Sequence, residues 1–211
     1  MTIQDLAAWY EMEGLSLAHH KTEAILLTGR KVSRGIRIRC GEAEINTKKA
    51  AKYLGVILEM NSTFRTHVSN VCDKAMRYAN SLSLLMPNLG GAGVTARRLY
   101  YKVVESVILY AAPFWSSALE NKGNVRLLIG TQRSALLRTA QAYRTVSADA
   151  RCVITGQVPI DLMIEKRLHV FQKKGEITGI AEDTIGRLKK SARDISIERW
   201  QQRWEMSTKG R

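Results

Sequence analysis

The sequence is poor in cysteine and has no long apolar run. Its three cysteines, Cys40, Cys72 and Cys152, are far apart and odd in number. This excludes a disulfide framework and a Cys-x-x-Cys zinc site, and we expect all three to be small core residues. No stretch of 18 apolar residues is present, so no membrane span is expected, and the first residues lack the pattern of a secretory signal.

The acidic residues are not grouped as a catalytic metal centre would require. Phosphoryl transfer on nucleic acid usually needs two metal ions held by clustered carboxylates, but the sequence contains no Asp-Asp or Asp-x-Asp. It also lacks a P-loop, a Gly-x-Gly-x-x-Gly motif and a Gly-x-Ser-x-Gly motif. His19 and His20 have no third ligand at useful spacing before Glu23, which disfavours a metal site. Composition and motifs alone therefore predict no catalytic centre.

The charge, in contrast, is strongly one-sided. The chain has 211 residues with 33 Lys and Arg against 19 Asp and Glu, a net charge of +14. The excess is 15 − 10 = +5 in residues 1–120 and 18 − 9 = +9 in residues 121–211. Charge spread in this way suits a folded surface that faces an extended polyanion. Solubility is the alternative explanation, and we favour nucleic acid.

Residues 1–60 carry the pattern of a small mixed domain. Apolar spacing predicts a helix over 3–13 that stops at Gly14. The continuous run Ala24–Leu27 predicts a strand buried on both faces, and the alternation from Ile36 to Ile45 predicts a hairpin that turns at Gly41-Glu42. Tyr53–Leu58 predicts one further strand. We expect one helix and three to four mainly antiparallel strands, too few for a complete domain.

Residues 61–211 are expected to be almost entirely helical, so the predicted fold class is α+β: a partial α/β region followed by a helical one. Ser147 is a good N-cap, Gly156 a stop and Pro159 a first-turn residue. The predicted helices and their inward residues are 62 to Pro87 (Phe64, Val68, Val71, Cys72, Ala75, Ala79, Leu82, Leu85), Thr95 to Pro113 (Leu99, Val103, Val107, Tyr110), 125–140 (Val125, Leu128, Ile129, Leu136, Ala140), 147–156, 159–171 (Ile160, Ile164, Leu168, Phe171) and 185–204 (Ile185, Leu188, Ala192, Ile195).

Several short motifs occur in a fixed order along nearly the whole chain. They are Gly14-Leu15-x-Leu17, Lys21-Thr22-Glu23, Lys52-Tyr53-Leu54-Gly55-Val56, Tyr110-Ala111-Ala112-Pro113-x-Trp115, Gln132-Arg133-x-Ala135-Leu136-Leu137-Arg138, Tyr143-Arg144-Thr145-Val146-Ser147-x-x-Ala150 and Gly156-x-x-Pro159-Ile160-x-Leu162. The ordered set resembles the reverse transcriptase of non-LTR (LINE-type, jockey-like) retrotransposons. The resemblance implies the end of the palm in residues 1–60 and the thumb in residues 61–211.

The resemblance also implies what lies outside these residues. In the family, the fingers and the palm strand with the catalytic aspartates precede the Lys-Thr-Glu motif, and a Cys/His-rich knuckle follows the thumb. The expected partners are those missing regions, an RNA template and an RNA/DNA hybrid, with no membrane. No cofactor is expected in this chain, although Mg²⁺ is expected for the intact RNA-directed DNA polymerase. The chain alone is expected to be inactive, in the cytoplasm or nucleus.

Individual roles follow from the motif positions. Lys21 matches the lysine of polymerase motif D, implicated as a proton donor to pyrophosphate, or it is a surface lysine. Tyr53, Leu54 and Gly55 match the primer-grip hairpin, or they form a strand with a packing glycine. The cations expected to contact nucleic acid, which equally suit a solvated surface, are Lys48, Lys49, Lys52, Arg97, Arg98, Lys102, Arg133, Arg138, Arg144, Lys189, Lys190 and Arg193.

Two pairs of aromatic residues have predicted roles. One of Tyr100 and Tyr101 is expected to pack inward while the other stacks on a sugar or base. Trp200 and Trp204 are expected to form a packing ridge rather than a stacking platform.

Two other classes of function remain open for the whole chain. The chain is alternatively a standalone basic helical RNA-binding module, a domesticated remnant, whose tight binding should depend on salt. Or it is a non-functional product of a pseudogene or gene-model error, for which poor solubility is expected.

Overall fold

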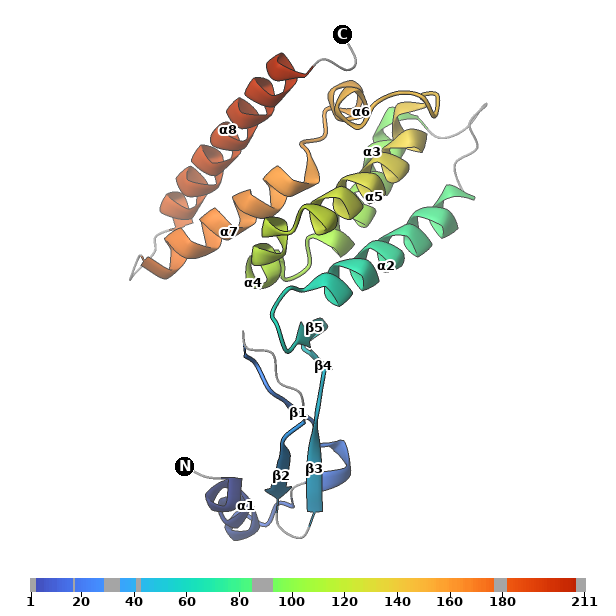
Figure 1. Ribbon diagram of the computed structural model, residues 1–211. Helices are drawn as coiled ribbons and strands as arrows, with labels where there is room; N and C mark the ends of the chain where they lie inside the picture. The colour runs from blue at the N-terminus through green and yellow to red at the C-terminus, as the bar shows by residue number, and fades with distance from the viewer. Residues whose placement is uncertain are drawn as a thin grey trace. The chain divides into compact units, whose positions relative to one another are not determined.

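The computed structural model describes residues 3–16, 18–28, 35–40, 43–84, 93–176 and 182–207. The chain divides into two compact units, residues 1–66 and residues 67–211 (Figure 1). The first contains short strands and one α-helix, and the second is helical. This confirms the predicted α+β class in which helices dominate.

The first unit is built around small sheets. Its elements are α1 (Ile3–Met12), the 3-10 turn η1 (His19–Lys21), β1 (Ala24–Ile25), β2 (Arg37–Cys40), β3 (Ala43–Lys48), β4 (Ala50–Tyr53) and β5 (Val56–Glu59). Strands β1, β3 and β2 form one sheet in that order, with β1 parallel and β2 antiparallel to β3. The described residues thus hold five strands, one more than the upper expectation. Gly14 follows α1 with φ +70°, as its predicted role as a helix stop requires.

Of the two strand predictions for residues 24–45, one is confirmed and the other is wrong. The hairpin is confirmed, because Ile38 pairs with Ile45 across β2 and β3; its turn, Gly41-Glu42, lies outside the described residues. The doubly buried strand over Ala24–Leu27 is wrong. Strand β1 ends at Ile25 and is only half-buried, and Leu27, two residues further along, is 57% exposed. An edge strand with one partner lacks the cover that a doubly buried strand needs.

A tight hairpin replaces the single strand predicted for Tyr53–Leu58. Strand β4 pairs antiparallel with β5, and Tyr53 lies opposite Val56. The two residues between them both have positive φ, +46° at Leu54 and +86° at Gly55. A two-residue loop with two positive φ angles matches the right-handed twist of the flanking strands. The glycine therefore makes the turn, rather than packing within a strand.

The second unit consists of helices around one apolar core. They are α2 (Arg65–Ser83), α3 (Val94–Ile108), α4 (Ala112–Trp115), the 3-10 turn η2 (Ser116–Glu120), α5 (Lys122–Ala140), α6 (Ala148–Thr155), α7 (Ile160–Glu176) and α8 (Glu182–Met206). Helix α5 contacts α3, α6 and α7, and α8 lies against α7 (Figure 1). The caps of α6 are as predicted: the Ser147 hydroxyl accepts from the Ala150 amide at 3.1 Å, and Gly156 has φ +64°.

The inward face of α3 is not the predicted one. Leu99 and Tyr110 are 67% and 56% exposed, whereas Tyr100, Tyr101 and Ile108 are buried. Both sets recur at helical spacing, so periodicity alone did not separate them. The hydroxyl groups of both tyrosines are hydrogen-bonded inside the unit. That of Tyr100 donates to the Ala79 carbonyl at 3.2 Å, and that of Tyr101 accepts from the Gln132 side chain at 2.7 Å. The expectation that one of them is free to stack on nucleic acid is therefore wrong.

Smaller corrections concern helix ends and single side chains. Helix α3 ends at Ile108, and Pro113 lies in the first turn of α4 instead of stopping α3. Phe171 and Ile195, expected to face inward, are 65% and 45% exposed. Within the described residues, no helix is long and apolar enough to cross a membrane.

The cysteines of the helical unit are core residues, as predicted. Cys72 and Cys152 are 2% and 3% exposed, and both are free thiols. Burial, with Asp149 and Asp161 nearby, raises the pKa of Cys152 to about 12, and burial also raises the pKa of Cys72. Both thiols therefore stay protonated at neutral pH, as structural rather than reactive cysteines do. The side chain of Cys40 lies outside the described residues.

Candidate nucleic-acid interface

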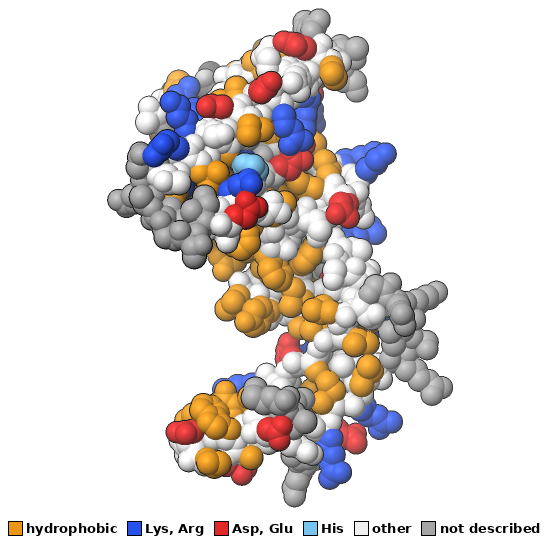
Figure 2. All heavy atoms as spheres, turned by 90° about the vertical axis from the view of Figure 1, so that its left-hand side faces the viewer, with side chains coloured by type: hydrophobic (Ala, Val, Ile, Leu, Met, Phe, Trp, Pro, Cys, Tyr) orange, Lys and Arg blue, Asp and Glu red, His pale blue; other side chains and the backbone are white. Residues whose placement is uncertain are grey.

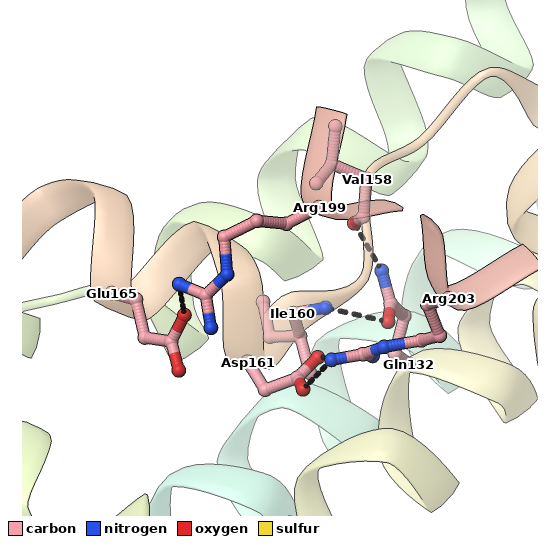
Figure 3. A network of polar contacts seen from close by, with 7 residues as sticks. All are labelled: Gln132, Val158, Ile160, Asp161, Glu165, Arg199 and Arg203. Atoms are coloured by element: carbon pink, nitrogen blue, oxygen red, sulfur yellow. Dashed lines mark hydrogen bonds and ion pairs between the residues drawn. The ribbon is translucent and has the colours of Figure 1, made fainter. Parts of the chain in front are cut away.

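Gln132 on α5 joins its own helix to α3 and to the start of α7. Its side-chain amide nitrogen donates to the Tyr101 hydroxyl at 2.7 Å and to the Val158 carbonyl at 2.9 Å. Its amide oxygen accepts from the Ile160 backbone nitrogen at 2.9 Å (Figure 3). The side chain is 2% exposed, so these bonds replace the water that it would otherwise need. Gln132 thereby fixes the start of α7 against α5 and α3.

Two arginines hold the backbone of the segment between α5 and α6. Arg151, only 2% exposed, donates through Nη1 to the Arg133 carbonyl at 2.8 Å. Its Nη2 donates to the carbonyls of Tyr143 and Arg144 at 3.1 and 2.8 Å. Arg133 adds a 2.6 Å bond from its own Nη2 to the Arg144 carbonyl. We call residues 141–147 the α5–α6 loop; its carbonyls are fixed by guanidinium groups although it has no regular structure.

A pair of charges joins the first turn of α7 to the last turns of α8. Arg203 donates to both carboxylate oxygens of Asp161, at 2.6 and 3.1 Å. The hydrogen bond to Asp161 outweighs burial and raises the pKa of Arg203. One turn earlier on α8, Arg199 bonds to Glu165 (Figure 3). The end of α8 is therefore held to α7 by side-chain ion pairs as well as by apolar contact.

Two of the arginines predicted to contact nucleic acid are hydrogen-bonded to backbone carbonyls of their own unit. Arg97 is 3% exposed and donates to the Arg138 carbonyl at 2.8 Å, in the last turn of α5. Arg133 is bonded to the α5–α6 loop. Helix C-termini leave carbonyls without intrahelical partners, and an arginine is a suitable donor for them. Within the described residues, these two side chains hold the scaffold together.

Two of the lysines predicted to contact nucleic acid form ion pairs with glutamates. Lys48 on β3 bonds to Glu23 at 2.5 Å, and both side chains are about half exposed. Lys102 on α3 bonds to Glu105 at 2.7 Å, where the glutamate side chain is only 8% exposed. The exposed pair of Lys48 and Glu23 contributes little to stability. Neither pair prevents a contact with phosphate, but each reduces the local positive charge.

Most of the remaining predicted cations are open to solvent. They lie on separate elements: two on or beside β4, one on α3, one in the α5–α6 loop and three on α8, and Arg138 on α5 is half-buried. Those that are exposed and have no ion-pair partner in the described part of the chain are Lys49, Lys52, Arg98, Arg144, Lys189, Lys190 and Arg193. On the face shown in Figure 2, the basic and acidic side chains of the helical unit are interspersed.

The segment with the most concentrated positive charge includes three predicted cations, Arg133, Arg138 and Arg144, and two that the motifs did not indicate, Lys122 and Arg126. Residues 121–148 contain Lys122, Arg126, Arg133, Arg138 and Arg144 and no Asp or Glu, a local charge of +5. This segment comprises α5 and the α5–α6 loop. A count of acidic residues along the chain would have revealed it from sequence alone.

The residues predicted to belong to the palm, Lys21 and Tyr53 to Gly55, lie in the first unit. Lys21 ends η1 and is exposed. Tyr53 and Leu54 are 62% and 73% exposed at the turn between β4 and β5. No group of three His, Cys, Asp or Glu that would hold a metal occurs in the described ranges. The residues present therefore do not fit the Mg²⁺ that the resemblance implies for the intact polymerase.

Comparison with curated proteins finds similar sequences in insect retrotransposons. Three of them are named retrovirus-related Pol polyproteins: type-1 retrotransposable element R1 4 of Nasonia vitripennis (27% identity over 84% of this chain), R1 of the same species (27% over 96%) and R1 of Bradysia coprophila (27% over 96%). The chain derives from a non-LTR retrotransposon. It spans 47%, 64% and 21% of those relatives. No protein-family model and no solved structure matches it.

The structure gives a physical reason for one motif of this retrotransposon-derived chain. In Tyr110–Trp115, Ala111 has φ +49° and the chain reverses into α4. Trp115 is fully buried, its Nε1 donates to the Tyr110 carbonyl at 2.9 Å, and its ring meets the His67 ring edge-on at 5.5 Å. The motif therefore builds a turn around a buried tryptophan. Its residues serve the scaffold of the helical unit.

Proposed function

We propose that this chain is the palm end and thumb of a retrotransposon reverse transcriptase and that it contributes binding of the template-primer duplex. The palm part corresponds to residues 1–60 and the thumb to residues 61–211. Three observations support this: the relatives are Pol polyproteins, the ordered motifs span the chain, and the net charge is +14. Because the sequence has no Asp-Asp or Asp-x-Asp, the proposal includes no polymerase activity for the chain alone.

The observation that carries the proposal is that the arginines and lysines fall into two groups, one bonded inside the helical unit and one exposed to solvent. Arg97, Arg133 and Arg151 hold carbonyls inside the helical unit. Seven of the exposed cations predicted to contact nucleic acid, among them Arg98 and Arg144, have no ion-pair partner in the described ranges. Phosphate contacts position a protein on a duplex without reading its sequence, and an A-form hybrid is recognised mainly by shape and backbone. We therefore expect binding without base preference.

Salt-dependent binding tests the proposal. Affinity for a fluorescent RNA/DNA hybrid is measured by anisotropy over a range of salt for the wild type and for a variant with Lys189→Gln, Lys190→Gln and Arg193→Gln. The slope of log K against log salt should fall by up to about one for each cation that contacts a phosphate. Lys173→Gln is the control, because Lys173 is paired with Glu176 at 2.7 Å. No binding by the wild type, or an unchanged slope, would contradict the proposal.

Primer extension tests the claim of inactivity separately. With Mg²⁺, nucleotides and a primed RNA template, the isolated chain should extend no primer, and any incorporation would overturn that part of the proposal. Competition with single-stranded RNA distinguishes the standalone RNA-binding module. A module of that kind should bind single-stranded RNA at least as tightly as the hybrid, whereas a thumb should bind the hybrid more tightly than single-stranded RNA.

A further inference from the structure

The α5–α6 loop has a fixed backbone, and its two central side chains are exposed. The carbonyls of Tyr143, Arg144 and Val146 accept from Arg133 or Arg151 at 2.6 to 3.4 Å. The Val146 amide also donates to the Tyr143 carbonyl at 3.1 Å. Loops held by a rigid scaffold are common places for binding residues. The side chains of the loop therefore have a defined position, and ligand binding would not require further ordering of the backbone.

Tyr143 differs from the buried tyrosines of the helical unit. Its side chain is 85% exposed, whereas Tyr100 and Tyr101 are 5% and 0% exposed. An aromatic ring left so largely in water beside a cation contributes little to the packing of this unit. It is, however, a suitable platform for a planar, π-bearing ligand.

The surroundings of Tyr143 favour an anionic ligand. The segment 121–148 carries +5 and no acidic residue. The exposed face of α5, which leads to the loop, contains Arg126, Gly130 and Ser134, and Gly130 borders open space. The small residues leave room for an extended backbone to approach. Lys122, Arg126 and Arg144 of this segment are exposed. A segment with three exposed cations, no acid and one exposed ring fits a nucleic-acid strand better than a protein, whose interface would bring carboxylates and apolar anchors.

We propose that Tyr143 stacks on an unpaired base of the bound nucleic acid while Arg144 contacts the neighbouring phosphate. This inference rests on the proposed function and adds which part of the substrate the loop takes. Bases inside a duplex are already stacked on each other, so an exposed ring reaches only a single-stranded nucleotide. The loop therefore binds the unpaired template strand next to the hybrid.

The experiment compares two hybrids of equal duplex length, one blunt and one with a single-stranded template overhang containing 2-aminopurine. Tyr143→Ala should weaken binding to the overhang hybrid at least about fivefold, because base–aromatic stacking is lost. Binding to the blunt hybrid should change less than about twofold, and Tyr143→Phe should behave as the wild type. Stacking should also quench the 2-aminopurine fluorescence in the wild type and in Tyr143→Phe. Phe171→Ala, which removes another exposed ring, is the control.

The outcomes separate the two proposals. If the wild type binds neither hybrid, both the proposed function and this inference fail. If it binds both hybrids and Tyr143→Ala binds them equally well, only this inference fails. If Tyr143→Phe loses as much affinity as Tyr143→Ala, the hydroxyl group makes the contact and the stacking proposal is overturned. All Tyr143 variants should melt at the wild-type temperature, because the side chain that they change is 85% exposed.

Discussion

Asp161 and Arg203 are 42 residues apart in sequence and are joined by two hydrogen bonds of 2.6 and 3.1 Å. The Asp161 side chain is 12% exposed, so it has little access to water if its partner is removed. Arg203→Ala should therefore lower the free energy of unfolding by about 2 kcal/mol, the cost of an unpaired buried acceptor. Urea denaturation followed by circular dichroism measures the change. The neighbouring pair provides a matched control.

Arg199 and Glu165 are 51% and 37% exposed in their side chains, on the same two helices. A pair with this exposure contributes about 0 to 1 kcal/mol. Arg199→Ala should thus cost less than Arg203→Ala in the same denaturation experiment. Equal losses in the two variants would show that the packing of the arginine stems, rather than the buried carboxylate, holds α8 to α7.

Gln132→Leu is expected to be among the more damaging single substitutions in the helical unit. It keeps the side-chain volume but removes the partners of Val158 and Ile160, leaving buried backbone groups unsatisfied. The expected loss in unfolding free energy is about 2 to 4 kcal/mol. Gln201→Leu is the control, since it removes one exposed bond, to Glu205. A loss in Gln132→Leu as small as in Gln201→Leu would mean that water satisfies the freed groups.

Features that depend on a few adjacent residues were predictable from sequence. Ser147 and Gly156 bound α6 as expected, because capping is decided within one turn of the helix. The register of α3 was not predictable, because its buried face includes Arg97 and Glu105 among its apolar residues. A rule that places charged residues outside fails where a partner satisfies the buried charge. Glu105 pairs with Lys102 on the same helix, but the partner of Arg97 is a carbonyl 41 residues away, which becomes known only from the fold.

The same limit applies to the candidate interface. Arg97 and Arg98 are adjacent and chemically identical, yet one is buried against a carbonyl 41 residues away and the other is exposed. Sequence shows that a cation is present and not which way it faces, since one residue turns the helix by about 100°. Tyr143 was visible only as part of a motif. Its exposure follows from the way Arg151 holds the backbone beneath it.

The hairpin of β4 and β5 should respond in opposite directions to changes at its two turn residues. Gly55 has φ +86°, so Gly55→Ala should destabilise the hairpin by about 1 kcal/mol. Leu54 has φ +46° and is 73% exposed, and Leu54→Asn should stabilise it, because asparagine accepts positive φ. Hydrogen exchange of the amides in residues 50–59 measures both effects. Faster exchange in Leu54→Asn would argue against this turn.

Glu59 should make stability depend on pH. Its carboxylate accepts from the Thr66 amide and the Thr63 hydroxyl, each at 3.1 Å. Burial acts to raise its pKa, but the hydrogen bonds from Thr66 and Thr63 hold the pKa below the ordinary 4.5. The folded state therefore binds fewer protons than the unfolded state, so the stabilisation is present above pH 4.5 and is lost as pH falls through the lower folded value. Glu59→Gln should remove this dependence: the difference in unfolding free energy from wild type, measured in urea, should shrink between about pH 6 and about pH 3. A difference that stays constant over that range would show that the carboxylate is not held by these bonds.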